Sequence, residues 1–223
     1  MKAFFVTASG TDVGKTYVTS GIIRAARQLG FAASGIKPVM SGYDGNTPQA
    51  SDAGILLEAM GKQVNAKTIA AIAPWRYAAP LSPDMAAARE GRCLNLPDIL
   101  TFCAAAIRAA PGMMLVEGVG GALVPLDASH TVRDWIAALG QPALLVAGSY
   151  LGTLSHTLTA AEALLSHGVE IAAIVLNESE ISPVPPAETA TAIGRFLPNV
   201  PLHIIPRHLN DISFLNLTNY LRS

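Results

Sequence analysis

Six short, strongly apolar runs recur along the chain and constrain its fold more than any other feature. The runs are AFFVT, GIKPV, MMLVEG, PALLVAGS, EIAAIVLN and PLHIIP. Hydrophobicity within a run is continuous rather than alternating, which is typical of strands covered on both faces, as in a parallel sheet. We therefore expect a strand at each of these six positions.

Helix-like segments separate the runs. They span roughly Lys15–Leu29, Ser51–Met60, Leu96–Ala109, Val132–Leu139, Thr153–His167 and Ala187–Phe196. This alternation predicts an α/β fold with a doubly wound, mainly parallel sheet, helices on both faces, and ligands at the carboxyl ends of the strands. Gly30, Gly140 and Gly168 are expected to end three of the helices. The proline-containing region Asn65–Gly91 is predicted to be a long connection with one short helix.

Composition points to a single domain over residues 1–223. The chain is 51% hydrophobic, so it can bury a substantial core, and its net charge of −1 offers no electrostatic footprint for nucleic acid or an anionic membrane. Cys93 and Cys103 lack CxxC spacing and are expected to be reduced thiols that are mostly packed. The apolar start is too short for a signal peptide, and no apolar stretch reaches the roughly 18 residues of a membrane span. We expect a soluble, cytoplasmic enzyme.

The stretch TASGTDVGKT has the context of a phosphate-binding loop. It begins at Thr7, where the first expected strand ends, and Lys15 opens the first expected helix. Backbone N–H groups of Asp12, Val13, Gly14 and the helix start would hold phosphate oxygens, with Lys15 at the terminal phosphates and the Thr16 hydroxyl on Mg²⁺. The alternative is that Lys15 and Thr16 merely begin a surface helix, and the strand–loop–helix context favours the phosphate loop.

The loop departs from two common patterns. Ser9 stands where a standard loop has its first glycine, five residues before Gly14. Partition-type ATPases carry a signature lysine four residues before the second glycine, and here that position is Gly10. Because that lysine supplies a charge across the dimer interface of those ATPases, the sequence disfavours that subclass.

Two carboxylates are candidate Mg²⁺ ligands beside Thr16. Glu117 ends the run MMLVE just before the glycines of GVGG, the placement of a metal carboxylate at a strand end. The alternative for Glu117 is a turn residue that faces solvent, which we consider weaker. For Asp52, a role in capping the next helix together with Ser51 is equally consistent with the sequence.

Lys37 follows the second expected strand in the stretch IKPVMSG. At the carboxyl end of a strand it would face the same crevice as the phosphate loop, where it could neutralise a transferring phosphoryl group or hold an anionic substrate. The alternative is a lysine that extends from a strand end into water. We expect a Lys37→Ala variant to fold normally and to lose turnover.

Taken in order, these stretches and several others resemble the dethiobiotin synthetase family. The resemblance rests on TASGTDVGKT, KPVMSG, SDA, APLSPDMAAAREGR, VEGVGGALVPL, GSYLGTLSHTLTAAEAL, IVLNE and IIP, so it runs nearly end to end. It implies a fold like that of P-loop NTPases, with ATP and Mg²⁺ as cofactors. In that family the first glycine of the loop stands six residues before the second, where this chain has Ala8, and a glutamate usually stands at Asp12.

The resemblance implies a reaction and its residues. The diamine 7,8-diaminopelargonate takes up CO₂ as a carbamate, ATP phosphorylates the carbamate, and the second amine closes the cyclic urea of dethiobiotin. Catalytic roles are implied for Lys37, Lys15 and Thr11. The implied substrate contacts are Ser41, Ser82, Gly118, Val119, Gly152, Thr153, Leu154 and Ser155.

Further roles also come from the resemblance. Asn177 is implied to read the adenine, although a turn-forming asparagine at a strand end is the simpler interpretation of the residue alone. Pro206, Arg207 and His208 are implied to flank the base and ribose. The helix that opens near Gly152 is implied to receive the substrate carboxylate across the interface of a homodimer.

Three other functions remain open from the sequence. One is another ATP-dependent amide- or cobyrinate-type synthetase, although its glutamine-dependent members need an amidotransferase domain for which 223 residues leave no room. A second is a nucleotide-switched regulatory ATPase with a membrane-targeting or partner helix, for which SFLNLTNYLRS is apolar but too weakly basic. A third is a non-catalytic relative with an altered loop.

Overall fold

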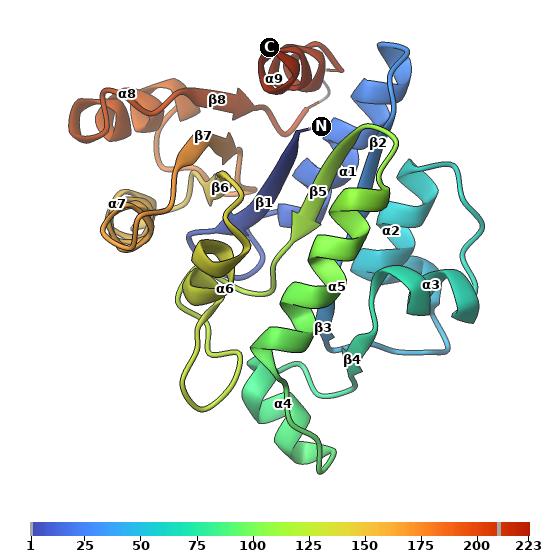
Figure 1. Ribbon diagram of the computed structural model, residues 1–223. Coiled ribbons are helices and arrows are strands. Elements are labelled where there is room, and N and C mark those ends of the chain that lie inside the picture. The colour runs from blue at the N-terminus through green and yellow to red at the C-terminus, as the bar shows by residue number, and fades with distance from the viewer. Residues whose placement is uncertain (1, 209–210) are drawn as a thin grey trace.

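A six-stranded parallel sheet forms the centre of the protein (Figure 1). The computed structural model describes residues 2–208 and 211–223. The strands are β1 (Ala3–Ala8), β2 (Ala33–Ile36), β5 (Met113–Glu117), β6 (Ala143–Gly148), β7 (Ile171–Asn177) and β8 (Leu202–Ile205). Their order is β2-β5-β1-β6-β7-β8, and all neighbouring pairs are parallel. Each of the six apolar runs contributes one of these strands, as predicted.

Helices cover both faces of this sheet, which confirms the doubly wound fold (Figure 1). On one face lie α1 (Lys15–Gln28), α2 (Asp52–Ala59) and α9 (Asp211–Arg222), and on the other α5 (Leu96–Ala109), α6 (Val132–Leu139), α7 (Thr153–Leu165) and α8 (Pro186–Phe196). Because both faces are covered, every residue of β1 and β6 is buried, which explains their continuous hydrophobicity. The six expected helices all form within two residues of their expected bounds.

The expectation for Asn65–Gly91 is wrong in detail. This region contains α3 (Ala66–Ile72), β4 (Trp75–Tyr77) and α4 (Pro83–Arg89) rather than one short helix. A capping box between Asn65 and Thr68 starts α3 and could have been read from the sequence. β4 pairs in parallel with β3 (Val39–Ser41), so the run GIKPV is divided between β2 and a small second sheet.

The helix α9 was not expected either. Phe214, Leu217, Thr218 and Leu221 form its buried side, at the i, i+3, i+4, i+7 spacing of an amphipathic helix. The helix packs against α1 and β8, so the apolar residues of SFLNLTNYLRS pack against the protein's own core.

The structure also tests the expected helix-ending glycines, the cysteines and the absence of a membrane span. Gly30, Gly140 and Gly168 follow helices with positive φ values of 77°, 65° and 76°, which confirms them as helix ends. Both cysteines are free thiols, with Cys103 buried as expected and Cys93 exposed against the expectation. Within the described residues, none of the helices combines the length and the apolar character needed to cross a membrane.

Candidate active site

The phosphate loop connects the end of β1 to the start of α1. Gly14 caps α1 with φ of 96°, a left-handed conformation that favours glycine. Asp12 also has a positive φ, 57°, and no other non-glycine residue within 2–208 or 211–223 does. The turn therefore falls on Asp12 rather than on Ser9, and aspartate is one of the few residue types that tolerate this conformation.

Gly14 is also required for packing, and this gives a prediction. A Cβ atom at Gly14 would lie 2.3 Å from Asn177 Nδ2. We expect Gly14→Ala to lower the free energy of unfolding by about 1–3 kcal/mol through strain and this close contact, as measured by chemical denaturation. Gly10→Ala is the matched control, because the nearest atom to its Cβ would be Tyr150 Oη at 3.9 Å. Equal stability of the two variants would contradict the prediction.

Lys15 is the first residue of α1 and is buried against the loop, with an exposed fraction of 7%. Burial disfavours its charged form and the charge of Lys37 repels it, which lowers the pKa of Lys15 to about 8 from its ordinary 10.5. A polyanion bound at the start of α1 would favour the ammonium form again. The Lys15 ammonium group is therefore placed to pair with a bound phosphate.

Thr16, Lys37, Asp52 and Glu117 form one connected group, which we call the Lys37 cluster. Lys37 Nζ lies 2.8 Å from Glu117 Oε1 and 2.8 Å from Asp52 Oδ2, and it donates to the Gly118 carbonyl at 2.8 Å. The Thr16 hydroxyl oxygen lies 2.6 Å from Glu117 Oε1 and 2.8 Å from Asp52 Oδ1. Because β2 and β5 are neighbours, their carboxyl ends bring Lys37 and Glu117 together.

Ion pairs to Lys37 hold the Lys37 cluster together, although Lys37 and Glu117 are buried. Lys37 is 3% exposed, and burial by itself lowers its pKa, but the charges and hydrogen bonds of Glu117 and Asp52 outweigh burial and raise the pKa of Lys37 above its ordinary value. Burial likewise raises the pKa of Asp52, whereas the charge and hydrogen bond of Lys37 lower it below the ordinary value overall. Lys37 and Asp52 therefore carry opposite charges at neutral pH.

The positions of the two carboxylates decide between the alternatives left open by the sequence. Glu117 is fully buried, so it is not a turn residue facing solvent. Asp52 is the first residue of α2, but the cap is Ser51, whose side chain accepts from the Gly54 N–H, and the Asp52 carboxylate points into the cluster instead. Both carboxylates therefore belong to the site.

The oxygen atoms of the cluster suit a hard divalent cation. Glu117 Oε2 is buried and has no hydrogen-bond partner, an arrangement that is costly unless something binds it. Together with Asp52 and the Thr16 hydroxyl it offers the oxygen donors that Mg²⁺ prefers, and Mg²⁺ on a triphosphate takes only one or two carboxylates. In the described part of the chain, no group of three or more His, Cys, Asp or Glu side chains is arranged to hold a metal ion.

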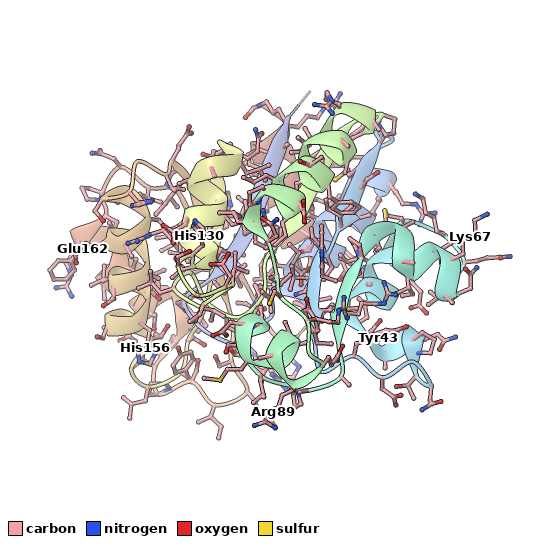
Figure 2. The ribbon with its side chains drawn as sticks, turned by 60° about the horizontal axis from the view of Figure 1, so that its bottom comes forward. Tyr43, Lys67, Arg89, His130, His156 and Glu162 are labelled. Carbon is pink, nitrogen blue, oxygen red and sulfur yellow. The ribbon has the colours of Figure 1, made fainter. Side chains whose placement is uncertain are left out.

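A cleft of about 720 Å³ opens beside the loop and the cluster, at the carboxyl ends of the strands. β1 and β5 run from top to bottom in Figure 1, so Figure 2, in which the bottom comes forward, brings their carboxyl ends toward the viewer, with α4, which ends at the labelled Arg89, in front. Ten predicted site residues line the cleft: Thr11, Asp12, Gly14, Lys15, Thr16, Lys37, Ser41, Asp52, Ser82 and Val119. The lining residues that sequence reasoning missed are Tyr17, Pro80, Leu81, Pro83, Gly120 and Val124.

Of the residues predicted to hold the base, Asn177 contacts the phosphate loop, and none of the four lines this cleft. Asn177 Nδ2 donates to the Val13 carbonyl at 3.0 Å from the end of β7. At the end of the adjacent β8, the Arg207 N–H donates to Glu178 Oε2 at 2.9 Å, beside Pro206 and His208. Their contact with adenine stays a prediction.

The residues predicted at the start of α7 also lie away from the cleft. The Thr153 side chain turns inward and donates to the Gly148 carbonyl at 2.6 Å, while Gly152, Leu154 and Ser155 are exposed. Leu151 beside them is 86% exposed. Gly118, predicted to contact substrate, instead accepts from Lys37 through its carbonyl. For these five residues the substrate role stays a prediction.

The parallel sheet, the phosphate loop between β1 and α1, and the carboxylate at the end of β5 define a P-loop nucleotide-binding protein. The cell division ATPase MinD of Pyrococcus furiosus has a similar fold, with a TM-score of 0.57 and 17% identity over 100% of this chain and 99% of that one. A ParA family ATPase from Chlorobium tepidum matches with a TM-score of 0.52 and 12% identity, over 99% and 90% of the two chains. These likenesses show the fold alone.

Sequence comparison defines the family. A family model described as an AAA domain matches residues 2–208. The ATP-dependent dethiobiotin synthetase of Acidiphilium cryptum is 55% identical over 90% of this chain and 91% of its own length. That of Methylobacterium nodulans is 50% identical over 87% and 89%. The chain belongs to the ATP-dependent dethiobiotin synthetase family.

Proposed function

We propose that this protein forms dethiobiotin from 7,8-diaminopelargonate, CO₂ and ATP. The observation that carries the proposal is the Lys37 cluster, which joins a buried lysine, two carboxylates and the loop hydroxyl at the rim of the cleft. Identity of 55% to a dethiobiotin synthetase over most of both chains supports the same assignment. Residues 1–223 would act as one domain, in the cytoplasm.

The phosphate end of ATP fits the loop. Backbone N–H groups at Asp12, Val13 and Gly14 and the start of α1 would hold the phosphates, and Lys15 would pair with them. Thr16, Asp52 and Glu117 would hold Mg²⁺, which supplies positive charge against the triphosphate when it is bound. Asn177 and residues 206–208 would contact the base and ribose.

The reaction needs positioned reactants and charge stabilisation. One amine of the diamine adds to CO₂ and loses a proton, giving a carbamate. A carbamate oxygen attacks the γ-phosphorus of ATP and ADP leaves; then the second amine attacks the carbamoyl carbon, and phosphate leaves with loss of a proton. Lys37 and Lys15 would stabilise the charge on the transferring phosphoryl group. Ring closure is intramolecular, so proximity supplies much of the acceleration.

The diamine would lie in the cleft between the loop and α4. Thr11, Ser41, Ser82 and Val119 line that space. The start of α7, where Gly152, Leu154 and Ser155 are exposed and Thr153 is buried, lies outside the cleft and would receive the substrate carboxylate from the site of a second copy. Exposed Leu151 and Leu154, next to this helix start, support such a homodimer contact.

One assay tests the proposal. Purified protein with Mg²⁺-ATP, bicarbonate and 7,8-diaminopelargonate is expected to yield dethiobiotin, ADP and phosphate in equal amounts. Omission of the diamine or of bicarbonate is the control and is expected to abolish ADP formation. Hydrolysis of ATP that is indifferent to the diamine would instead favour a nucleotide-switched regulatory ATPase, and no turnover of ATP at all would favour a non-catalytic relative.

A further inference from the structure

Tyr17 is the aromatic side chain that lines the cleft beside the phosphate loop. It follows Thr16 directly, and successive side chains of an α-helix point about 100° apart, so Tyr17 leaves α1 on another side than Thr16 does. Thr16 faces the Lys37 cluster. The ring of Tyr17 instead packs edge to face on Phe214 of α9, with centroids 5.5 Å apart and an angle of 70° between the rings. Its exposed fraction is 43%, so part of the ring stays open to a ligand.

Phe214 holds a fixed position beneath this ring. It fits against Gly21, one turn after Tyr17 on α1, so closely that a Cβ on Gly21 would lie 2.2 Å from the phenylalanine ring. Phe214 is 9% exposed, and Leu217 and Leu221 of the same helix are buried with it. The packing of α9 therefore sets where Phe214 lies, and Phe214 in turn limits where the ring of Tyr17 can lie.

The strand order places α9, on which the ring of Tyr17 packs, toward the side of β1 on which Asn177 lies. Lys37 and Glu117 end β2 and β5, which lie on one side of β1, whereas Asn177 ends β7 on the other side. α9 packs against α1 and against β8, the neighbour of β7. With the triphosphate directed toward the Lys37 cluster, the rest of a nucleotide would extend toward Asn177 and the open ring of Tyr17.

We propose that Tyr17 contacts the base and ribose of the bound nucleotide and that Phe214 positions it, so that the C-terminal helix is part of the nucleotide site. The inference rests on the proposed ATP-dependent function. The family model ends at residue 208, before this helix, so the match itself assigns α9 no role. The buried apolar side of α9 is already used against α1 and β8, which leaves it unsuited to the membrane or partner role considered from the sequence.

Calorimetric binding of two ligands tests the role of Tyr17. Tyr17→Ala is expected to raise the Kd of Mg²⁺-ADP about tenfold, the usual size of one base–aromatic contact. The Kd of inorganic tripolyphosphate, which has no base or ribose, is expected to change less than about twofold. Tyr17→Phe keeps the ring and is expected to restore most of the ADP affinity. An unchanged Kd for ADP in Tyr17→Ala, or an equal loss for both ligands, would overturn the proposal.

Steady-state kinetics test the positioning role of Phe214. Phe214→Leu is expected to raise the KM for ATP several-fold while kcat falls less, because the ring that it supports does not touch the reacting atoms. The matched control is Leu217→Ala, which removes a fully buried side chain of the same helix but leaves both rings. It is expected to lower Tm with little change in the KM for ATP. If Leu217→Ala raises that KM as much as Phe214→Leu does, α9 acts through stability alone and the positioning role is refuted. A native chain that binds no ADP refutes the proposed function as well.

Discussion

Replacing Lys37 with alanine is expected to lower kcat for dethiobiotin formation by about 100- to 1,000-fold, the usual cost of removing one preorganised group that stabilises transition-state charge. The structure also revises the expectation that this variant folds normally. Lys37 is the buried partner of the fully buried Glu117, and removing it leaves that carboxylate without its cation. We therefore expect the free energy of unfolding to fall by about 3–5 kcal/mol, measured by chemical denaturation without nucleotide.

A double variant separates the two effects of Lys37. In Lys37→Ala with Glu117→Gln, the buried charge is gone together with its partner, so much of the lost stability is expected to return. Turnover is expected to stay as low as in Lys37→Ala. Near-native kcat in Lys37→Ala, at saturating ATP and diamine, would remove Lys37 from the mechanism.

Glu117→Gln alone is expected to weaken the response to Mg²⁺. The amide keeps the shape of the side chain but loses the charge that would hold the cation beside Thr16 and Asp52, while Lys37 keeps its pairing with Asp52. We expect the Mg²⁺ concentration for half-maximal activity to rise about tenfold or more, and kcat at saturating Mg²⁺ to fall by about 100-fold. Activity measured over a Mg²⁺ titration gives both quantities.

Glu162→Gln is the matched control for this experiment. Glu162 is an exposed glutamate on α7, and its side chain points outward at the edge of the molecule, away from the cleft (Figure 2). The same change of charge there is expected to leave the Mg²⁺ titration unchanged. If Glu117→Gln and Glu162→Gln give the same titration as the native protein, Glu117 is not a metal ligand.

The structural neighbours show how little the fold says about chemistry. MinD and ParA family ATPases share the sheet and its helices at 12–17% identity. The loop of this chain differs from the partition-type pattern at Gly10, where the signature lysine is absent, and it turns at Asp12. Function therefore follows from the side chains around the cleft and from the family, and not from the architecture.

Sequence reasoning succeeded where a local pattern reports directly on burial or backbone geometry. Strands buried on both faces have continuous apolar runs, and the loop between β1 and α1 contains the sequence GKT. Both the strands and the phosphate loop could therefore be predicted. The capping box at Asn65 and the spacing of Phe214, Leu217 and Leu221 carried similar signals for α3 and α9, and these were not used. Tyr17 carried no signal of this kind, because its neighbour Phe214 comes from the other end of the chain.

By itself the sequence determined the parallel α/β fold, the phosphate loop and the residue types needed for phosphoryl transfer, because periodicity and motifs are local. The tertiary structure alone decided that Asp52 serves the cluster rather than the helix cap, that Glu117 is buried with one oxygen unpaired, and that Lys37 joins them. These facts depend on residues 36 to 101 positions apart that meet only when β2, β5 and α2 pack beside α1. The pairing of buried Lys37 with Glu117 and Asp52 depends on that packing, and a local sequence pattern cannot predict it.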